Sequence, residues 1–113
     1  MTINSGSITT HVLDTVLGKP ASGVAVRLDM LSDGVWDAVS ESATDADGRC
    51  GYLAVQAASG QYRLTFFTEP YFARHGRSSI YPEISITFLC DAQSRYHLPL
   101  LLSDNSYTTY RGS

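Results

Sequence analysis

The strongest constraint on the fold is a two-residue alternation of apolar and polar side chains that recurs along the chain. It is clearest in residues 24–31, 62–67 and 84–89. Successive side chains of a β-strand point to opposite faces, so this pattern predicts strands with one buried face. Five further β-rich stretches are predicted at residues 8–14, 35–42, 49–55, 96–103 and 106–110. About eight short strands separated by Gly, Asp and Pro turns indicate an all-β fold, an antiparallel β-sandwich.

One segment does not follow this alternation. Residues 69–75 read Glu-Pro-Tyr-Phe-Ala-Arg-His, and the proline falls early, where the first turn of a helix tolerates it. The sequence therefore predicts one short helix there, bounded by Gly76. With 113 residues the chain is expected to form a single domain, 1–113, in which the polar residues 1–7 are flexible.

Composition argues against several classes of partner. The net charge is −3 and the eight Lys and Arg residues are scattered, whereas nucleic-acid binding favours a basic patch. No apolar stretch approaches the roughly 20 residues of a membrane helix. No signal peptide is visible and the final Arg-Gly-Ser is unlike a peroxisomal signal, so a cytoplasmic location is expected. Cys50 and Cys90 are then expected to be free thiols.

Three histidines are candidates for chemistry. His11 and His97 fall in predicted strands, where a histidine taken alone is more often structural, and His75 lies at the predicted helix end, where it interacts with the last carbonyls or with solvent. A catalytic zinc site typically takes three protein ligands, and no third ligand stands at suitable spacing, so no metal site is predicted. Residues 45–48, Asp-Ala-Asp-Gly, resemble the start of a calcium loop, but no Glu follows at the twelfth position. A tight turn is the prediction there.

Neither a Gly-x-Ser-x-Gly motif nor a phosphate-binding glycine loop is present. The chemistry available is that of histidine, arginine, tyrosine and serine, and the last four residues, 110–113, carry three of these types. A neutral imidazole takes a proton near neutral pH, and a guanidinium binds carbonyl or anionic groups with a planar fork. This inventory suits general-base activation of water on a small polar or anionic ligand.

Four motifs together resemble one family. They are Thr-His-Val-Leu-Asp at 10–14, Thr-Asp-Ala-Asp-Gly-Arg at 44–49, Tyr-His-Leu-Pro-Leu-Leu-Leu-Ser at 96–103 and Tyr-Thr-Thr-Tyr-Arg-Gly-Ser at 107–113. From about Ile8 to Ser113 the chain resembles the transthyretin-related 5-hydroxyisourate hydrolases. The Tyr-Arg-Gly-Ser tail is the most specific element, because in this family it separates the hydrolase from the hormone carrier transthyretin.

The resemblance implies a set of site residues. The catalytic positions are His11, Arg49, His97 and Ser113, and the substrate-binding positions are Tyr110, Arg111 and Gly112. His97, or the His11–His97 pair, would activate water, and Arg49 would orient the substrate and stabilise the oxyanion. Ser113 would relay a proton or bind the substrate. The reaction implied is hydrolytic opening of 5-hydroxyisourate to 2-oxo-4-hydroxy-4-carboxy-5-ureidoimidazoline in purine catabolism, without a metal or organic cofactor.

The resemblance also implies a transthyretin-like sandwich of two four-stranded sheets with one short helix. Four subunits would assemble as a dimer of dimers, with the sites in a channel between the dimers. Two positions depart from the family pattern: Arg95 stands where a second histidine is common, and the turn at residues 104–106 is unusual.

Two other readings remain open. The first is a transthyretin-like carrier of a small aromatic ligand, which needs no water-activating histidine. The second is a structural or adhesive β-sandwich, against which the absence of an export signal and the polar chemistry of residues 110–113 weigh.

Overall fold

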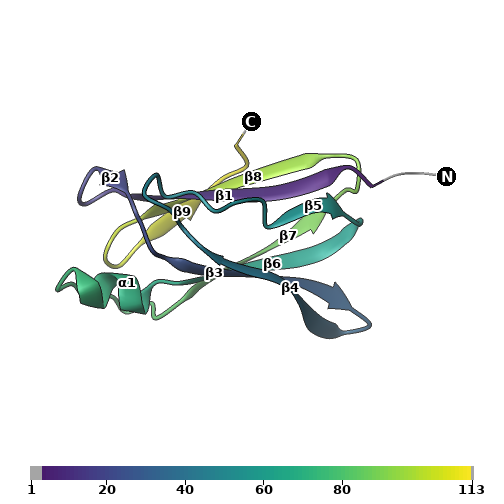
Figure 1. The fold of residues 1–113 in the computed structure, drawn as a ribbon. Helices are drawn as coiled ribbons and strands as arrows, with labels where there is room; N and C mark the ends of the chain where they lie inside the picture. The colour runs from purple at the N-terminus through teal and green to yellow at the C-terminus, as the bar shows by residue number, and fades with distance from the viewer. Residues whose placement is uncertain (1–3, 113) are drawn as a thin grey trace.

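Two β-sheets packed face to face make up the molecule in the computed structural model, which describes residues 4–112 (Figure 1). One sheet contains β1 (Gly6–Asp14), β2 (Lys19–Pro20), β5 (Ala54–Ala57), β8 (Arg95–Leu102) and β9 (Tyr107–Thr109). The other has β4 (Val35–Ala43), β3 (Ala25–Ser32), β6 (Gly60–Phe67) and β7 (Ile84–Cys90), in that spatial order. A single described helix, α1 (Glu69–Arg74), follows β6. The prediction of a β-sandwich with one short helix is confirmed.

The inward faces of the strands are the apolar faces that the alternation predicted. Along β1 every second residue is buried, so Ile8 and Val12 face the core while Thr9 and His11 point outward. The helix contributes Tyr71 and Phe72 to the interior. Val24, just before β3, is also fully buried. Further fully buried apolar side chains come from both sheets and include Val26, Leu28, Leu64, Phe66, Leu100 and Leu102.

Three details differ from the sequence prediction. Most of the predicted strand 49–55 is irregular, and a strand forms only at Ala54–Ala57, because a turn with Gly48 at a φ of +75° precedes it. The short strand β2 lies where only a turn was expected. Strand β1 begins at Gly6, within the segment 1–7 expected to be flexible, since the Ser7 N–H donates to the Ser94 carbonyl.

The pairing of β1 with β8 is parallel, whereas the other described strand pairs are antiparallel as the sequence pattern predicted. The two strands lie side by side over their whole length, from Ser7 opposite Arg95 to Asp14 opposite Leu102. A hairpin cannot make this pairing, because a parallel pair needs a long connection. Two segments far apart in the sequence therefore share one sheet surface.

A buried carboxylate joins the end of β1 to two other parts of the fold. The Asp14 side chain is fully buried and accepts hydrogen bonds from the Tyr71 hydroxyl at 2.7 Å and from Arg77 at 2.5 Å. Arg77 also donates to Asp104 in the turn between β8 and β9, at 2.6 Å. Burial opposes ionisation of Asp14, but the hydrogen bonds from Arg77, Tyr71 and the Leu17 backbone outweigh it and hold its pKa at about 2.

Cys50 and Cys90 are buried free thiols, as predicted. Burial raises the pKa of both thiols. Within residues 4–112, no helix is long and apolar enough to span a membrane.

Candidate active site on the outer face of the first sheet

The parallel pair β1–β8 presents a row of polar side chains on the outer face of its sheet. Ser7 and Thr9 alternate with core residues along β1, and Arg95 and His97 do so along β8. The register places Ser7 opposite Arg95 and Thr9 opposite His97. Four polar side chains from opposite parts of the sequence thus meet on one surface.

Two further segments extend this surface on either side. One edge of β1 pairs with β5 near its start and with β2 near its end. Between these two pairings, the loop before β5 lies along β1, and Arg49 in this loop forms an isolated β-bridge with His11. Gly48 allows this approach, because a side chain there would collide with the Val12 carbonyl oxygen. On the far side of β8, the Gly112 N–H donates to the His97 carbonyl at 2.7 Å. The order across the sheet is therefore Arg49, β1, β8 and the tail.

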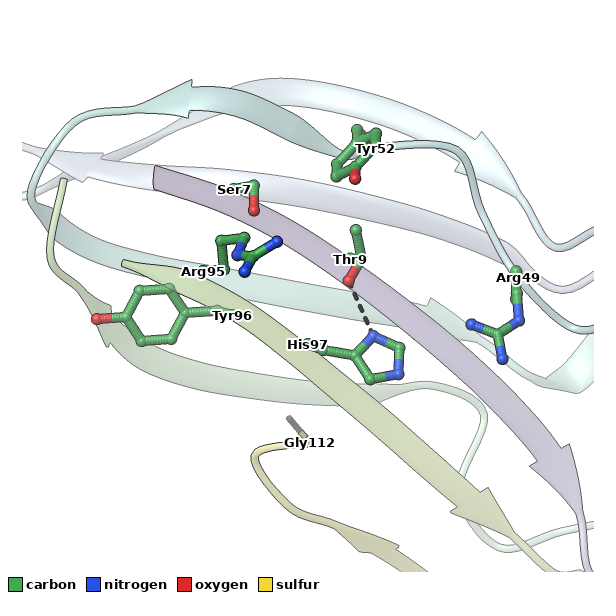
Figure 2. Close-up of a pocket in the computed structure, with 8 residues that line it drawn as sticks. All are labelled: Ser7, Thr9, Arg49, Tyr52, Arg95, Tyr96, His97 and Gly112. Carbon is green, nitrogen blue, oxygen red and sulfur yellow. Dashed lines mark hydrogen bonds between the residues drawn. The ribbon is translucent and has the colours of Figure 1, made fainter. Parts of the chain in front are cut away.

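A pocket of about 460 Å³ opens on this surface (Figure 2). Its volume lies in the range of small-molecule sites, roughly 300–1,000 Å³. The residues that line it are Ser7, Thr9, Arg49, Tyr52, Arg95, Tyr96, His97 and Gly112. Figure 2 shows Arg49 and Arg95 toward opposite ends, with the His97 imidazole between them. The lining suits a planar ligand rich in carbonyl groups or bearing negative charge.

The His97 imidazole is held and kept neutral by its surroundings. Its Nδ1 shares a hydrogen bond of 2.8 Å with the Thr9 hydroxyl, drawn as the dashed line in Figure 2. Burial lowers the pKa of His97 below its ordinary value, and the neighbouring charges of Arg49 and His11 lower it further. A neutral imidazole with Nδ1 engaged leaves Nε2 as the nitrogen available to a ligand or a water molecule.

His11 lies beside the pocket but is not among the residues that line it. Its Nε2–H donates to the Asp47 carbonyl oxygen at 2.8 Å, since a carbonyl only accepts. This bond fixes the proton of a neutral His11 on Nε2 and turns that side of the ring toward the 45–48 turn. Of the two strand histidines, His97 is the one that faces the cavity.

The predicted tail residues have separate environments. Gly112 lines the pocket, whereas the Arg111 guanidinium stacks 4.3 Å from the centre of the Tyr96 ring and donates to the Arg95 carbonyl at 3.1 Å. Tyr110 is 52% exposed and is not among the lining residues. Ser113 lies outside the described residues. The structure thus brings Arg49, His97 and Gly112 together, with Arg111 fastening the tail nearby.

Five lining residues were not proposed as site residues from the sequence: Ser7, Thr9, Tyr52, Arg95 and Tyr96. Period-two spacing from His11 signals the first two, because residues two apart on a strand share a face. The same rule applied to His97 places Arg95, which sequence analysis noted only as a departure. The spacing rule does not identify Tyr52, which lies in an irregular loop. It does not identify Tyr96 either, because Tyr96 is adjacent to His97 on the strand and is expected to point to the opposite face.

The donor set does not suit a metal. Within the described part of the chain, no three His, Cys, Asp or Glu side chains cluster closely enough to hold an ion. The His97 ring shares a hydrogen bond with the Thr9 hydroxyl and lies within electrostatic range of the positively charged Arg49, which repels a cation.

Replacing Gly112 with alanine is expected to displace the His97 ring. A Cβ at this position would lie 2.7 Å from His97 Cδ2, and the ring is held on its other side by Thr9. Misplacing a catalytic group by about 1 Å lowers the reaction rate by up to about 100-fold. We therefore expect Gly112→Ala to lower the kcat/KM of the reaction catalysed in this pocket by about 10- to 100-fold. Steady-state kinetics alongside a thermal melt measure this.

The matched control is Gly51→Ala, because a Cβ at residue 51 meets nothing within 4 Å. It should leave the rate within about twofold, as expected for an uncrowded surface position. Equal kcat/KM values in both variants would contradict the close fit of the tail to His97.

Comparisons of the sequence and of the structure with known proteins point to the same family. A model described as the HIUase/transthyretin family matches residues 8–112. A 5-hydroxyisourate hydrolase from Mus musculus is 43% identical over 118 residues, covering 100% of both chains. The structure of Klebsiella pneumoniae 5-hydroxyisourate hydrolase is 35% identical with a TM-score of 0.85, covering 96% of this chain and 99% of that one. Sea bream transthyretin in complex with thyroxine is 32% identical with a TM-score of 0.88, covering 93% of each chain.

Proposed function

The chain belongs to the HIUase/transthyretin family, and we propose that it hydrolyses 5-hydroxyisourate in the degradation of urate. The observation that carries the proposal is the His97 imidazole, whose pKa is lowered by burial, facing a pocket that also contains the Arg49 guanidinium. A ligand carrier has no use for a proton acceptor placed in this way. The substrate of the proposed reaction is planar and rich in carbonyl and N–H groups, which matches the polar lining.

His97 is the proposed general base. With Nδ1–H donating to the Thr9 hydroxyl, Nε2 has a free lone pair that takes a proton from water as the water attacks a ring carbonyl. Arg49 donates to the oxygen of that carbonyl and stabilises the negative charge that develops on it. The ring C–N bond then breaks, the departing nitrogen takes the proton back from His97, and the new carboxyl group ionises. Water is consumed and no cofactor enters the balance.

His11 is a positioning residue in this scheme. Its ring is tied to the Asp47 carbonyl, and it lies next to Arg49 through the β-bridge between the two residues. It also contributes to the lowered pKa of His97. Its role is to hold the Arg49 loop and to keep His97 unprotonated.

The direct test generates 5-hydroxyisourate with uricase and follows its ultraviolet absorbance with and without the protein. The expected result is decay well above the spontaneous rate, in proportion to protein concentration. Decay at the spontaneous rate, together with tight binding of an aromatic ligand such as thyroxine, would favour the carrier reading instead.

The pH dependence of the reaction should report the His97 pKa. Because the neutral form is active and its pKa is lowered from the ordinary 6.5, we expect the midpoint of the fall in kcat/KM to lie below pH 6.5, so that more than half of the maximum is left at pH 6.5. A rate profile from pH 4.5 to 8 measures the midpoint. In Arg49→Gln, one cause of the lowered pKa is absent, so the midpoint should move upward. A wild-type midpoint above 6.5 would contradict the assignment.

A homotetramer, a dimer of dimers, is part of the proposal. The turn after β1 exposes Val16 and Leu17, and Tyr52 at the rim of the pocket is 67% exposed. Exposed apolar side chains in the turns and loops beside the sheet that carries the site are suited to cover by another copy. Light scattering should give a mass four times 12.3 kDa. A monomeric mass in the active enzyme would contradict this arrangement.

A further inference from the structure

Arg95 is a cation in the pocket to which the proposed mechanism gives no role. It is the first residue of β8, two positions before His97 and directly opposite Ser7 of β1. Figure 2 shows its guanidinium beside Ser7, on the same surface as the His97 ring. The side chain is exposed, so it is available to a ligand entering the pocket.

Within residues 4–112, no carboxylate forms an ion pair with the Arg95 guanidinium. The lining residues include two arginines and no carboxylate. The ion pairs within these residues involve Arg27, Arg63 and Arg77. The nearby Arg111 donates to the backbone carbonyl of Arg95 and stacks on the Tyr96 ring. This end of the pocket therefore combines positive charge with the Ser7 hydroxyl.

The two arginines define the length of the site. Arg49 bridges to His11 and Arg95 pairs with Ser7, so their anchor points on β1 are four residues apart, or about 13 Å at roughly 3.3 Å per residue. Figure 2 shows the two arginine side chains on either side of the His97 ring, and the pocket of about 460 Å³ that they help to line lies over Thr9 and His97. If Arg49 acts at the reacting carbonyl, Arg95 meets the opposite edge of the ligand.

We propose that Arg95 is a specificity-determining residue that binds the anionic or carbonyl-bearing edge of the substrate remote from the reacting carbon. This rests on the proposed function. A guanidinium donates two parallel N–H bonds to such an edge, and these bonds are made equally in the ground state and the transition state. The preferred ligands are planar, oxygen-rich heterocycles in their monoanionic form.

The test compares Arg95→Gln, Arg95→Lys and Lys19→Gln with the wild type. Lys19 is exposed on β2 at the other end of β1, so Lys19→Gln removes the same charge away from the pocket. We expect Arg95→Gln to raise KM for 5-hydroxyisourate about tenfold with kcat within about twofold, the signature of lost uniform binding. The rise of KM between 20 and 300 mM salt should shrink in the same variant. The KM of Arg95→Lys should lie between those of the wild type and Arg95→Gln, because lysine keeps the positive charge but lacks the planar pair of N–H donors.

A second readout does not depend on turnover. Urate at pH 8 is a planar monoanion, and calorimetry should show it binding the wild type about tenfold more tightly than Arg95→Gln, with Lys19→Gln unchanged. An unchanged KM in Arg95→Gln, a loss confined to kcat, or equal weakening in Lys19→Gln overturns the proposal. A wild type that fails to accelerate hydroxyisourate decay overturns the proposed function alone, and the urate comparison then decides the role of Arg95.

Discussion

Replacing His97 with asparagine is expected to lower kcat by about 100- to 10,000-fold, the range that general-base catalysis contributes. Asparagine fills part of the same space and still offers hydrogen bonds to Thr9, but its amide does not take a proton from water. Because the proposed substrate contacts with Arg49 and Arg95 are left intact, KM should change little. Stopped-flow measurement of hydroxyisourate decay gives both constants.

Two further histidine variants make this result specific. His75→Asn changes the exposed histidine at the end of α1, away from the pocket, and should retain full activity. His11→Asn replaces the imidazole that is bonded to the Asp47 carbonyl, and it should lower kcat less than His97→Asn does. It should also shift the acid limb of the pH–rate profile. If His97→Asn stays within a few-fold of wild type, the assignment of the base is wrong.

The second large effect concerns stability. Asp14→Asn should lower the free energy of unfolding by about 3–5 kcal/mol, because it removes the fully buried counter-charge of the partly buried Arg77 guanidinium. The same carboxylate accepts bonds from the Tyr71 hydroxyl and from the backbone of the turn after β1, so several elements loosen together. Urea unfolding measures the loss. Asp37→Asn, the same change at an exposed site on β4, should stay within about 0.5 kcal/mol.

The pH dependence of stability provides an independent check. The folded-state pKa of Asp14, about 2, lies below its ordinary value of 3.8. The stabilisation is therefore complete above pH 3.8 and is lost as the pH falls from there through about 2, a change of about 2 kcal/mol. Asp14→Asn should lack this part of the acid dependence. A wild-type profile that is flat between pH 4 and 2 would contradict the lowered pKa.

The sequence alone predicted the strands well, because strands such as β1, β3 and β6 each have a face in the core. Val24 to Met30 and Ile84 to Phe88 carry that information locally, and so does the early proline of α1. The parallel pairing of β1 with β8 has no local signal, since it depends on how the sheets close. For the same reason the predicted strand at residues 49–55 was largely wrong: the 45–49 turn is held by its pairing with β1, and this keeps Arg49 outside any regular strand.

For the candidate site, the sequence identified several of the residues but not how they are oriented. Family motifs pointed to His11, Arg49 and His97, and the structure adds which of them faces the cavity. The orientation of His11 toward the Asp47 carbonyl and the contact of Gly112 with His97 depend on the tertiary structure. The sequence motifs that contain these residues do not indicate them. The roles of these residues stay predictions until the variants are measured.

The parallel register of β1 and β8 has a consequence for how the protein acquires its pocket. Thr9 and His97 are 88 positions apart, and Arg49 and Gly112 join them from two further segments. Closing such distant contacts is entropically costly and slows folding in proteins dominated by non-local pairs. No short fragment of the chain contains the four segments together. Recovery of catalysis during refolding should therefore coincide with the slowest phase of chain collapse into the native state, and partly folded species should be inert.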